Sequence, residues 1–104
     1  MQSINVADDN STYKSVRGIL YNKSQDTLIR VPPKYNDTCF YIPFSVVSIE
    51  DFAFEGCHSL QSINIPDEVT YIGDCVFEGC HSLQSIVIPN YIKYIGECLF
   101  MDCI

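Results

Sequence analysis

Single apolar residues recur at a fixed interval through the second half of the chain. The ten residues from Phe54 to Ile63 return unchanged from Phe77 to Ile86, 23 positions later. The same offset aligns three further columns: Pro43, Pro66 and Pro89; Ile49, Ile72 and Ile95; Phe54, Phe77 and Phe100. A period of this length indicates a solenoid, because each unit can bury its isolated apolar side chains only by stacking on its neighbours.

Each unit contains signals for one short strand and one tight turn. Ile63 and Ile65 alternate with a polar residue, which predicts a strand with both isoleucines facing inward, and Pro66 ends it. Asp51 is placed to cap a single helical turn, and Gly56 to end that turn in a left-handed conformation. The next unit repeats these signals, so we expect a coil of similar rungs.

The first part of the chain departs from this pattern. By analogy with the later units, Ile4 and Val6 predict a first short strand, and a polar, turn-rich segment follows it. Residues 18–21 and 27–31 read as two strands joined by a turn, an inserted hairpin. We therefore expect one domain made of a partial repeat (1–6), an inserted hairpin segment (7–38), regular repeats (39–94) and a truncated repeat (95–104). Because Met1 occupies a leucine position, we expect a segment of a longer solenoid or a short relic of one.

Composition restricts the class of partner. The 104 residues suit one domain, and 13 acidic against 6 basic side chains give a net charge of −7. This charge repels nucleic acid and anionic lipid over most of the surface. No apolar run approaches the roughly 18 residues of a membrane span, and the first four residues lack the features of a signal peptide. We expect neither nucleic-acid binding nor membrane insertion.

The repeat unit resembles a known family. The segment from Leu60 to Ile65 fits the strand of a leucine-rich repeat, and the whole unit is similar to the BspA-like variety of anaerobic bacteria and some protists. The residues behind this resemblance are Ile72-Gly73-Asp74, Phe77-Glu78-Gly79-Cys80, Leu83 and Ile86-Val87-Ile88-Pro89. The inserted segment from Tyr13 to Pro33 is also similar to the segment that interrupts the repeat arrays of this family. The chain departs from the family pattern at Cys75, Cys98 and Asp102.

The resemblance implies a fold and a type of function. The implied fold is a leucine-rich-repeat solenoid, an α/β-type right-handed coil that is rich in strands and has short helical turns. The implied function is that of a non-catalytic binding module in a secreted or cell-surface bacterial protein, in some members an adhesin for host matrix proteins. It gives no catalytic residues to transfer and no cofactor.

Six cysteines raise the question of disulfides and metals. Cys57, Cys80 and Cys103 form one column of the repeat, and Cys75 and Cys98 form another. Side chains stacked in parallel keep their Cβ atoms farther apart than a disulfide prefers, so we expect buried free thiols, with disulfides as the alternative. The register also explains every spacing that resembles a zinc site, and no metal is expected.

Two further groups of side chains are assigned structural roles. His58 and His81 occupy turn positions next to serine and are expected to be polar corner residues. Cys80 and His81 are adjacent in an extended segment and would point to opposite faces, which argues against a nucleophilic pair. Asp51, Asp74 and Glu97 form a carboxylate column, in which each is expected to cap its own turn, with calcium binding as the alternative.

The outward positions between the inward Leu and Ile residues form the candidate binding face. They are Arg30, Tyr41, Gln61, Ser62, Asn64, Gln84, Ser85 and Val87. The expected partner is a protein or a glycan, including host extracellular matrix. The alternative is a structural spacer without a ligand of its own. An enzyme is not expected, because a flat stack of rungs offers little concavity.

The C-terminal end of the coil predicts self-association. The strand at Ile86 to Ile88 and the apolar residues Leu99, Phe100, Met101 and Ile104 have no following rung in this chain. An uncovered strand edge recruits another chain. We therefore expect a homodimer formed through this end.

Overall fold

A computed structural model describes residues 3–33 and 38–100. The expectations on Met1, Met101, Asp102, Cys103 and Ile104 fall outside this range. Within it, the chain is rich in strands, and no residue lies in a helix. The predicted short helical turns are therefore wrong for the described residues, whereas the predicted richness in strands is confirmed.

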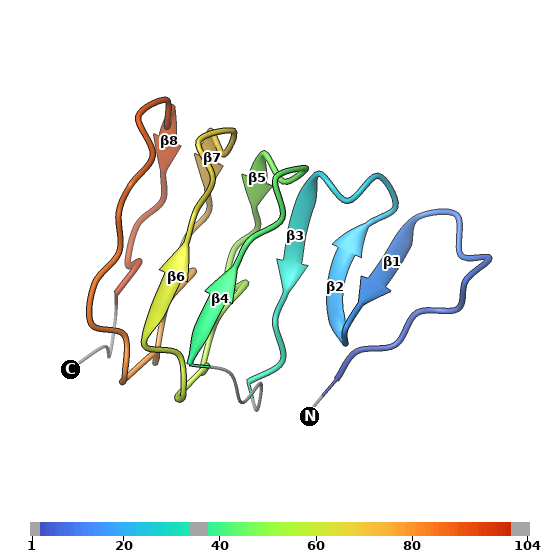
Figure 1. Cartoon of the computed structure of the whole chain (residues 1–104), viewed down its shortest axis with the longest axis horizontal. Helices are drawn as coiled ribbons and strands as arrows, with labels where there is room; N and C mark the ends of the chain where they lie inside the picture. The colour runs from blue at the N-terminus through green and yellow to red at the C-terminus, as the bar shows by residue number, and fades with distance from the viewer. Residues whose placement is uncertain (1–2, 34–37, 101–104) are drawn as a thin grey trace.

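Strands stack in two sheets, in the order that Figure 1 shows. The larger sheet has six strands in the order β1 (Tyr13–Val16), β2 (Ile19–Asn22), β3 (Thr27–Arg30), β5 (Ser48–Ile49), β7 (Tyr71–Ile72) and β8 (Tyr94–Ile95). The smaller sheet pairs β4 (Cys39–Tyr41) with β6 (Ser62–Asn64). Successive rungs place one short strand on each wall of the coil, so that the two sheets enclose the apolar core.

The pairing of the rungs follows the isoleucine columns of the sequence. Strands β5, β7 and β8 pair in parallel, with Ile49 opposite Ile72 and Ile72 opposite Ile95. On the other wall, Phe40 of β4 lies opposite Ile63 of β6. Because all these contacts join equivalent positions of neighbouring units, one inward residue per strand is enough to build a continuous core.

The N-terminal part is an antiparallel extension of the larger sheet. Strand β2 pairs antiparallel with β3, which confirms the predicted hairpin. Strand β1 was not expected, because its residues fall in the polar segment before the hairpin. It pairs with β2 through a two-residue turn at Arg17 and Gly18, whose φ values of 55° and 78° satisfy a type I′ turn.

Two predicted strands are absent from the described residues. Ile4 donates its N–H to the carbonyl of Gly18 (2.8 Å), and the N–H of Val6 donates to Ser15 Oγ (2.9 Å). The segment from Ile4 to Val6 is therefore hydrogen-bonded to the hairpin of β1 and β2 and does not form a strand of the coil. The predicted strand from Ile86 to Ile88 is reduced to a single parallel bridge between Ser62 and Ser85.

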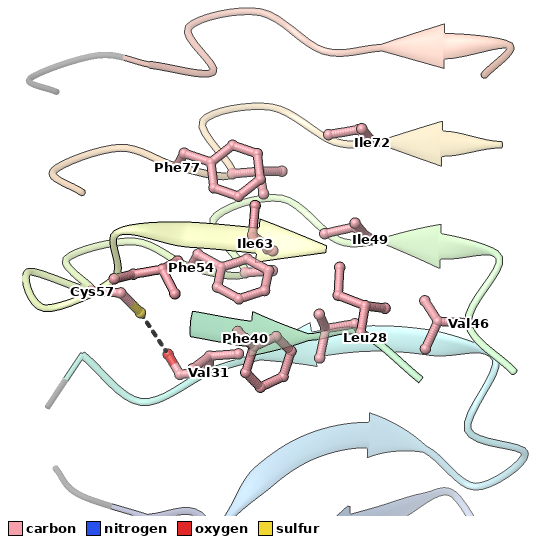
Figure 2. Close-up of a cluster of buried hydrophobic side chains, with 14 of the residues drawn as sticks. Leu28, Val31, Phe40, Val46, Ile49, Phe54, Cys57, Ile63, Ile72 and Phe77 are labelled. Atoms are coloured by element: carbon pink, nitrogen blue, oxygen red, sulfur yellow. Dashed lines mark hydrogen bonds between the residues drawn. The ribbon is translucent and has the colours of Figure 1, made fainter. Parts of the chain in front are cut away.

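The phenylalanine column fills the centre of the coil, as Figure 2 shows. Phe54 and Phe77 have no exposed surface, as the sequence predicted. Their rings stack with centroids 5.5 Å apart, and Phe77 stacks on Phe100 at 5.8 Å. The ring of Phe40 meets Phe54 edge-on at 5.4 Å, which closes the column toward the hairpin. The stacked rings therefore link the rungs along the axis of the coil.

The turn after each isoleucine differs from the prediction. Gly56 and Gly79 have the expected left-handed conformation, with φ of 75° and 74°. However, the N–H of Phe52 donates to the carbonyl of Asp74 in the next rung (3.0 Å). The N–H of Phe54 likewise donates to the carbonyl of Val76 (2.9 Å). These N–H groups are therefore engaged between rungs and are not available for a helical turn.

The aspartate column also acts between rungs. Asp51 Oδ1 accepts the N–H of Asp74 (2.7 Å), and Asp74 Oδ1 accepts the N–H of Glu97 (2.9 Å). The prediction that each carboxylate caps its own turn was wrong, because the turn that it would cap is not helical. Each aspartate instead holds the backbone of the following rung.

The cysteines divide into a buried and an accessible group. Cys57 and Cys80 are buried, as predicted, and the Cys57 thiol is free. Cys57 Sγ lies 3.8 Å from the carbonyl oxygen of Val31 (Figure 2), and Cys80 Sγ lies 3.1 Å from that of Phe54. The prediction of burial was wrong for the other column, since Cys75 is only half-buried and Cys98 is exposed.

We expect the buried and the accessible thiols to react with a thiol reagent at different rates. Burial raises the pKa of Cys57 to about 11, so little thiolate forms at neutral pH, and the reactive form is the thiolate. In the folded protein, Cys57 and Cys80 should react slowly with a thiol reagent and Cys39 and Cys98 rapidly. Mass spectrometry of proteolytic peptides after a brief exposure measures this. An intact Cys57–Cys80 disulfide in a non-reduced sample would overturn the assignment.

Candidate binding surface

Seven of the eight predicted face residues lie on one wall of the coil. They occupy β4, β6 and the equivalent positions of the next rung: Tyr41, Gln61, Ser62, Asn64, Gln84, Ser85 and Val87. Ser62 is half-buried and the others are exposed, with Tyr41 at 71% and Val87 at 80%. The inward residues between them, such as Phe40 and Ile63, are buried. We call this set the β4–β6 face.

The register of the rungs arranges the face in columns. Tyr41 lies opposite Asn64, and Ser62 forms a bridge with Ser85. Ser62 also lies opposite Cys39, which is exposed and therefore extends the face at the hairpin end. The sequence interpretation missed Cys39 because it treated the cysteines only as possible core residues or ligands. Subtracting the repeat interval from Ser62 would have placed it on the face.

Arg30 does not belong to this surface. It ends β3 in the six-stranded sheet, whereas the other predicted face residues lie on or beside the β4–β6 wall. Its guanidinium donates to the carbonyl of Phe52 (2.8 Å) and to Glu55 Oε1 (3.2 Å). The ion pair is partly exposed, so its contribution to stability is small. Arg30 thus holds the neighbouring turn and was wrongly included in the face.

The β4–β6 face is polar but uncharged. Its amide and hydroxyl groups both donate and accept hydrogen bonds, and none of its seven residues is acidic or basic. A hydrogen bond with the Cys39 thiol raises the pKa of the Tyr41 hydroxyl above its usual range. Such groups can make hydrogen bonds to a partner at a lower desolvation cost than ionised side chains.

The other candidate sites do not bring their groups together. Cys80 is buried, whereas His81 is exposed and stacks on His58 with parallel rings 5.1 Å apart. The two histidines are turn residues, as predicted. In residues 3–33 and 38–100, no group of three or more His, Cys, Asp or Glu side chains is arranged to hold a metal ion.

Large apolar side chains are exposed around the last described rung. They are Val87, Ile88, Tyr91, Tyr94, Ile95 and Phe100. Leu99, which was expected to be uncovered with them, is buried. Pairing with a second copy stays a prediction. Among the described residues, none belongs to a helix with the length and apolar character needed to span a bilayer.

The comparisons place this fold among known proteins. Residues 34–104 match the family described as BspA type Leucine rich repeat region (6 copies). A leucine-rich cell surface protein from Faecalibacterium prausnitzii is 36% identical with a TM-score of 0.90, and the match covers 100% of this chain and 28% of that protein. A leucine-rich repeat protein from Eubacterium ventriosum is 32% identical with a TM-score of 0.96, covering 99% of this chain and 28% of that one.

A third solved structure, the pneumococcal vaccine antigen PcpA, shares the fold at 24% identity and a TM-score of 0.84, over 88% of this chain and 22% of that protein. The comparison with curated proteins gave no significant match. The chain therefore spans about 28% of the length of the two more similar solved proteins. Since the family match extends over more than half of its length, the chain belongs to the BspA type leucine-rich repeat family.

Proposed function

We propose that the chain is a non-catalytic binding segment of a secreted or cell-surface protein, and that its β4–β6 face contacts a partner protein in adhesion, including adhesion to host matrix. The observation behind this proposal is the row of seven uncharged side chains that the rungs hold in register on one wall. The regular backbone fixes their spacing, and a rigid array loses little conformational entropy when it binds.

The composition of the face supports a protein partner. Protein interfaces favour aromatic residues and are depleted of charged residues at their centre. Tyr41 and Val87 supply exposed apolar surface on the face, and Gln61, Asn64 and Gln84 supply hydrogen bonds between them. A stable interface buries about 800 Å² on each partner. A face of three rungs is small for that area, so the contact would extend over neighbouring repeats of a longer protein.

The location is proposed by similarity. The Faecalibacterium prausnitzii relative, 36% identical, is described as a cell surface protein. A surface location would expose the β4–β6 face to extracellular partners. The match covers 28% of that relative, which supports a repeat array longer than these 104 residues.

The test compares variants that add the same charge to opposite walls. Wild type and variants are applied to an array of extracellular matrix proteins and polysaccharides. Asn64→Arg and Ser85→Arg place a bulky cation on the β4–β6 face, whereas Val47→Arg places it beside β5 on the other wall, where Val47 is 42% exposed. For a protein ligand that wild type binds, we expect Asn64→Arg and Ser85→Arg to weaken binding about tenfold or more.

The control, Val47→Arg, should change the affinity less than about twofold. Equal losses in all three variants would show that binding depends on charge and not on this face. If wild type binds only polysaccharides on the array, the partner is a glycan and not a protein. If wild type binds nothing on the array, the proposal fails in favour of a structural spacer.

A further inference from the structure

A small cavity separates the hairpin of β1 and β2 from β4. Its volume is about 240 Å³, and its walls include Arg17, Ile19 and Tyr21 of the hairpin and Phe40 and Tyr41 of β4. This is below the roughly 300–1,000 Å³ of pockets that hold whole small molecules. The cavity therefore has the size for one side chain of a partner.

The walls of the cavity combine apolar and polar side chains, and one cation lies at it. Val16, Ile19, Phe40 and Pro43 supply apolar surface. Arg17 is exposed, and the ion pair found in the described residues joins Arg30 to Glu55 and does not involve Arg17. A partly apolar cavity beside an exposed guanidinium suits an apolar group that has a carboxylate next to it.

The backbone conformation of Arg17 is unfavourable for its residue type. Its φ of 55° lies in the left-handed region, and it precedes Gly18, with φ of 78°, in the two-residue turn between β1 and β2. Asn, Asp and Gly are favoured at this turn position. The same conformation occurs at four other non-glycine residues of the described chain, so it identifies a position that asparagine can occupy and does not by itself mark a binding site.

The cavity adjoins the β4–β6 face. Tyr41 belongs to both, and Cys39, which extends the face, also lines the cavity. A partner lying on the face can therefore place one side chain in the cavity without any rearrangement of the rungs.

From these features we propose that the cavity binds one apolar side chain of the partner protein, and that Arg17 pairs with a carboxylate adjacent to that side chain in the partner. The proposal rests on the proposed function, because the partner is the protein on the β4–β6 face. Binding of a sugar is an outcome that the test below distinguishes, because Tyr21, Cys39 and Tyr41 also supply polar groups at the cavity. The net charge of −7 disfavours a strongly acidic partner, so one carboxylate and not an acidic run is the matching feature.

The test uses short capped peptides and backbone NMR spectra of the whole 104-residue chain. The probes contain Phe-Glu, Phe-Lys or Ser-Glu between glycines, and a disaccharide containing a uronic acid is the fourth probe. The Phe-Glu peptide should shift the amide signals of Ile19 and Tyr41 and should bind about 3- to 5-fold more tightly than Phe-Lys, as expected for one exposed ion pair. Ser-Glu should not shift these signals.

Arg17→Asn is the decisive variant, because asparagine adopts the left-handed conformation readily and removes only the cation. We expect its midpoint of thermal unfolding to equal or exceed that of wild type and its preference for Phe-Glu over Phe-Lys to disappear. Retention of that preference would overturn the role of Arg17. Shifts outside the cavity, or tighter binding of the uronic acid probe, would overturn the proposed ligand.

Ser85→Arg separates this inference from the proposed function. Ser85 lies on the third rung of the β4–β6 face, away from the cavity residues. The variant should bind the Phe-Glu peptide as wild type does, even though it weakens binding to the full partner. If Ser85→Arg leaves partner binding unchanged while Arg17→Asn abolishes the peptide preference, the proposed face is wrong and the cavity assignment stands.

Discussion

Replacing Phe77 with alanine should lower the free energy of unfolding by about 3–5 kcal/mol. Phe77 has no exposed surface, and its ring lies between those of Phe54 and Phe100, at 5.5 Å and 5.8 Å. Its removal leaves a cavity in the middle of the column, and a single row of rings has few neighbours that can move in to fill it. Equilibrium unfolding in urea, monitored by circular dichroism, measures the loss.

Phe44→Ala is the control for this substitution. Phe44 is 80% exposed, so its removal should change the free energy of unfolding by less than about 0.5 kcal/mol. A loss below about 1 kcal/mol for Phe77→Ala would mean that the phenylalanine column does not form the core. A similar loss for both variants would indicate an effect of aromatic content and not of burial.

The second large effect is expected at Gly73. A Cβ atom at this position would collide with the carboxylate of Asp51 and lie 2.7 Å from the backbone nitrogen of Asp51. We expect Gly73→Ala to destabilise the protein by about 2–3 kcal/mol, the usual range for an overpacked buried site. The same urea titration measures this loss. An unchanged midpoint of unfolding would show that the rungs do not approach as closely as the structure has them.

A double-mutant cycle identifies the source of the clash. Asp51→Ala removes the carboxylate that accepts the N–H of Asp74, and it opens space above Gly73. Gly73→Ala should therefore cost about 1 kcal/mol less in the Asp51→Ala background than in wild type. The contact with the Asp51 backbone remains, so part of the cost should persist. Strict additivity would show that the carboxylate is not the obstacle.

This coupling gives the Gly73-Asp74 pair a physical explanation. In Ile72-Gly73-Asp74, the glycine makes room for the aspartate of the preceding rung, and the aspartate binds the backbone of the following one. The sequence showed the carboxylate column, but the capping rule assigned each carboxylate to its own turn. A contact between equivalent positions of neighbouring rungs is invisible when one unit is read alone.

The core was the most predictable part of the structure. Because each unit repeats, one correct assignment of an inward residue applies to the whole column, as with Ile49, Ile72, Phe54 and Phe77. The hairpin of β2 and β3 followed from two apolar runs separated by a polar turn. Strand β1 was missed because Tyr13 to Val16 follows a polar segment, and its pairing depends on a turn with arginine at an unusual position.

The candidate face was predicted in part for the same reason. Strand alternation placed Asn64 outward and Ile63 inward, and the repeat interval extended this to the next rung. Arg30 was assigned wrongly because β3 belongs to the opposite wall, and one strand alone does not reveal its sheet. The cavity at Arg17 could not be predicted, since it forms only where the hairpin meets β4.

Hydrogen–deuterium exchange of the chain with and without a protein partner from the array tests the central proposal most directly. Binding to the β4–β6 face should slow exchange in peptides that contain β4 and β6 and leave those that contain β5 and β7 unchanged. The two walls carry equivalent rungs of the same molecule, so each is the control for the other. Protection confined to β5 and β7, or spread equally over both walls, would contradict the account.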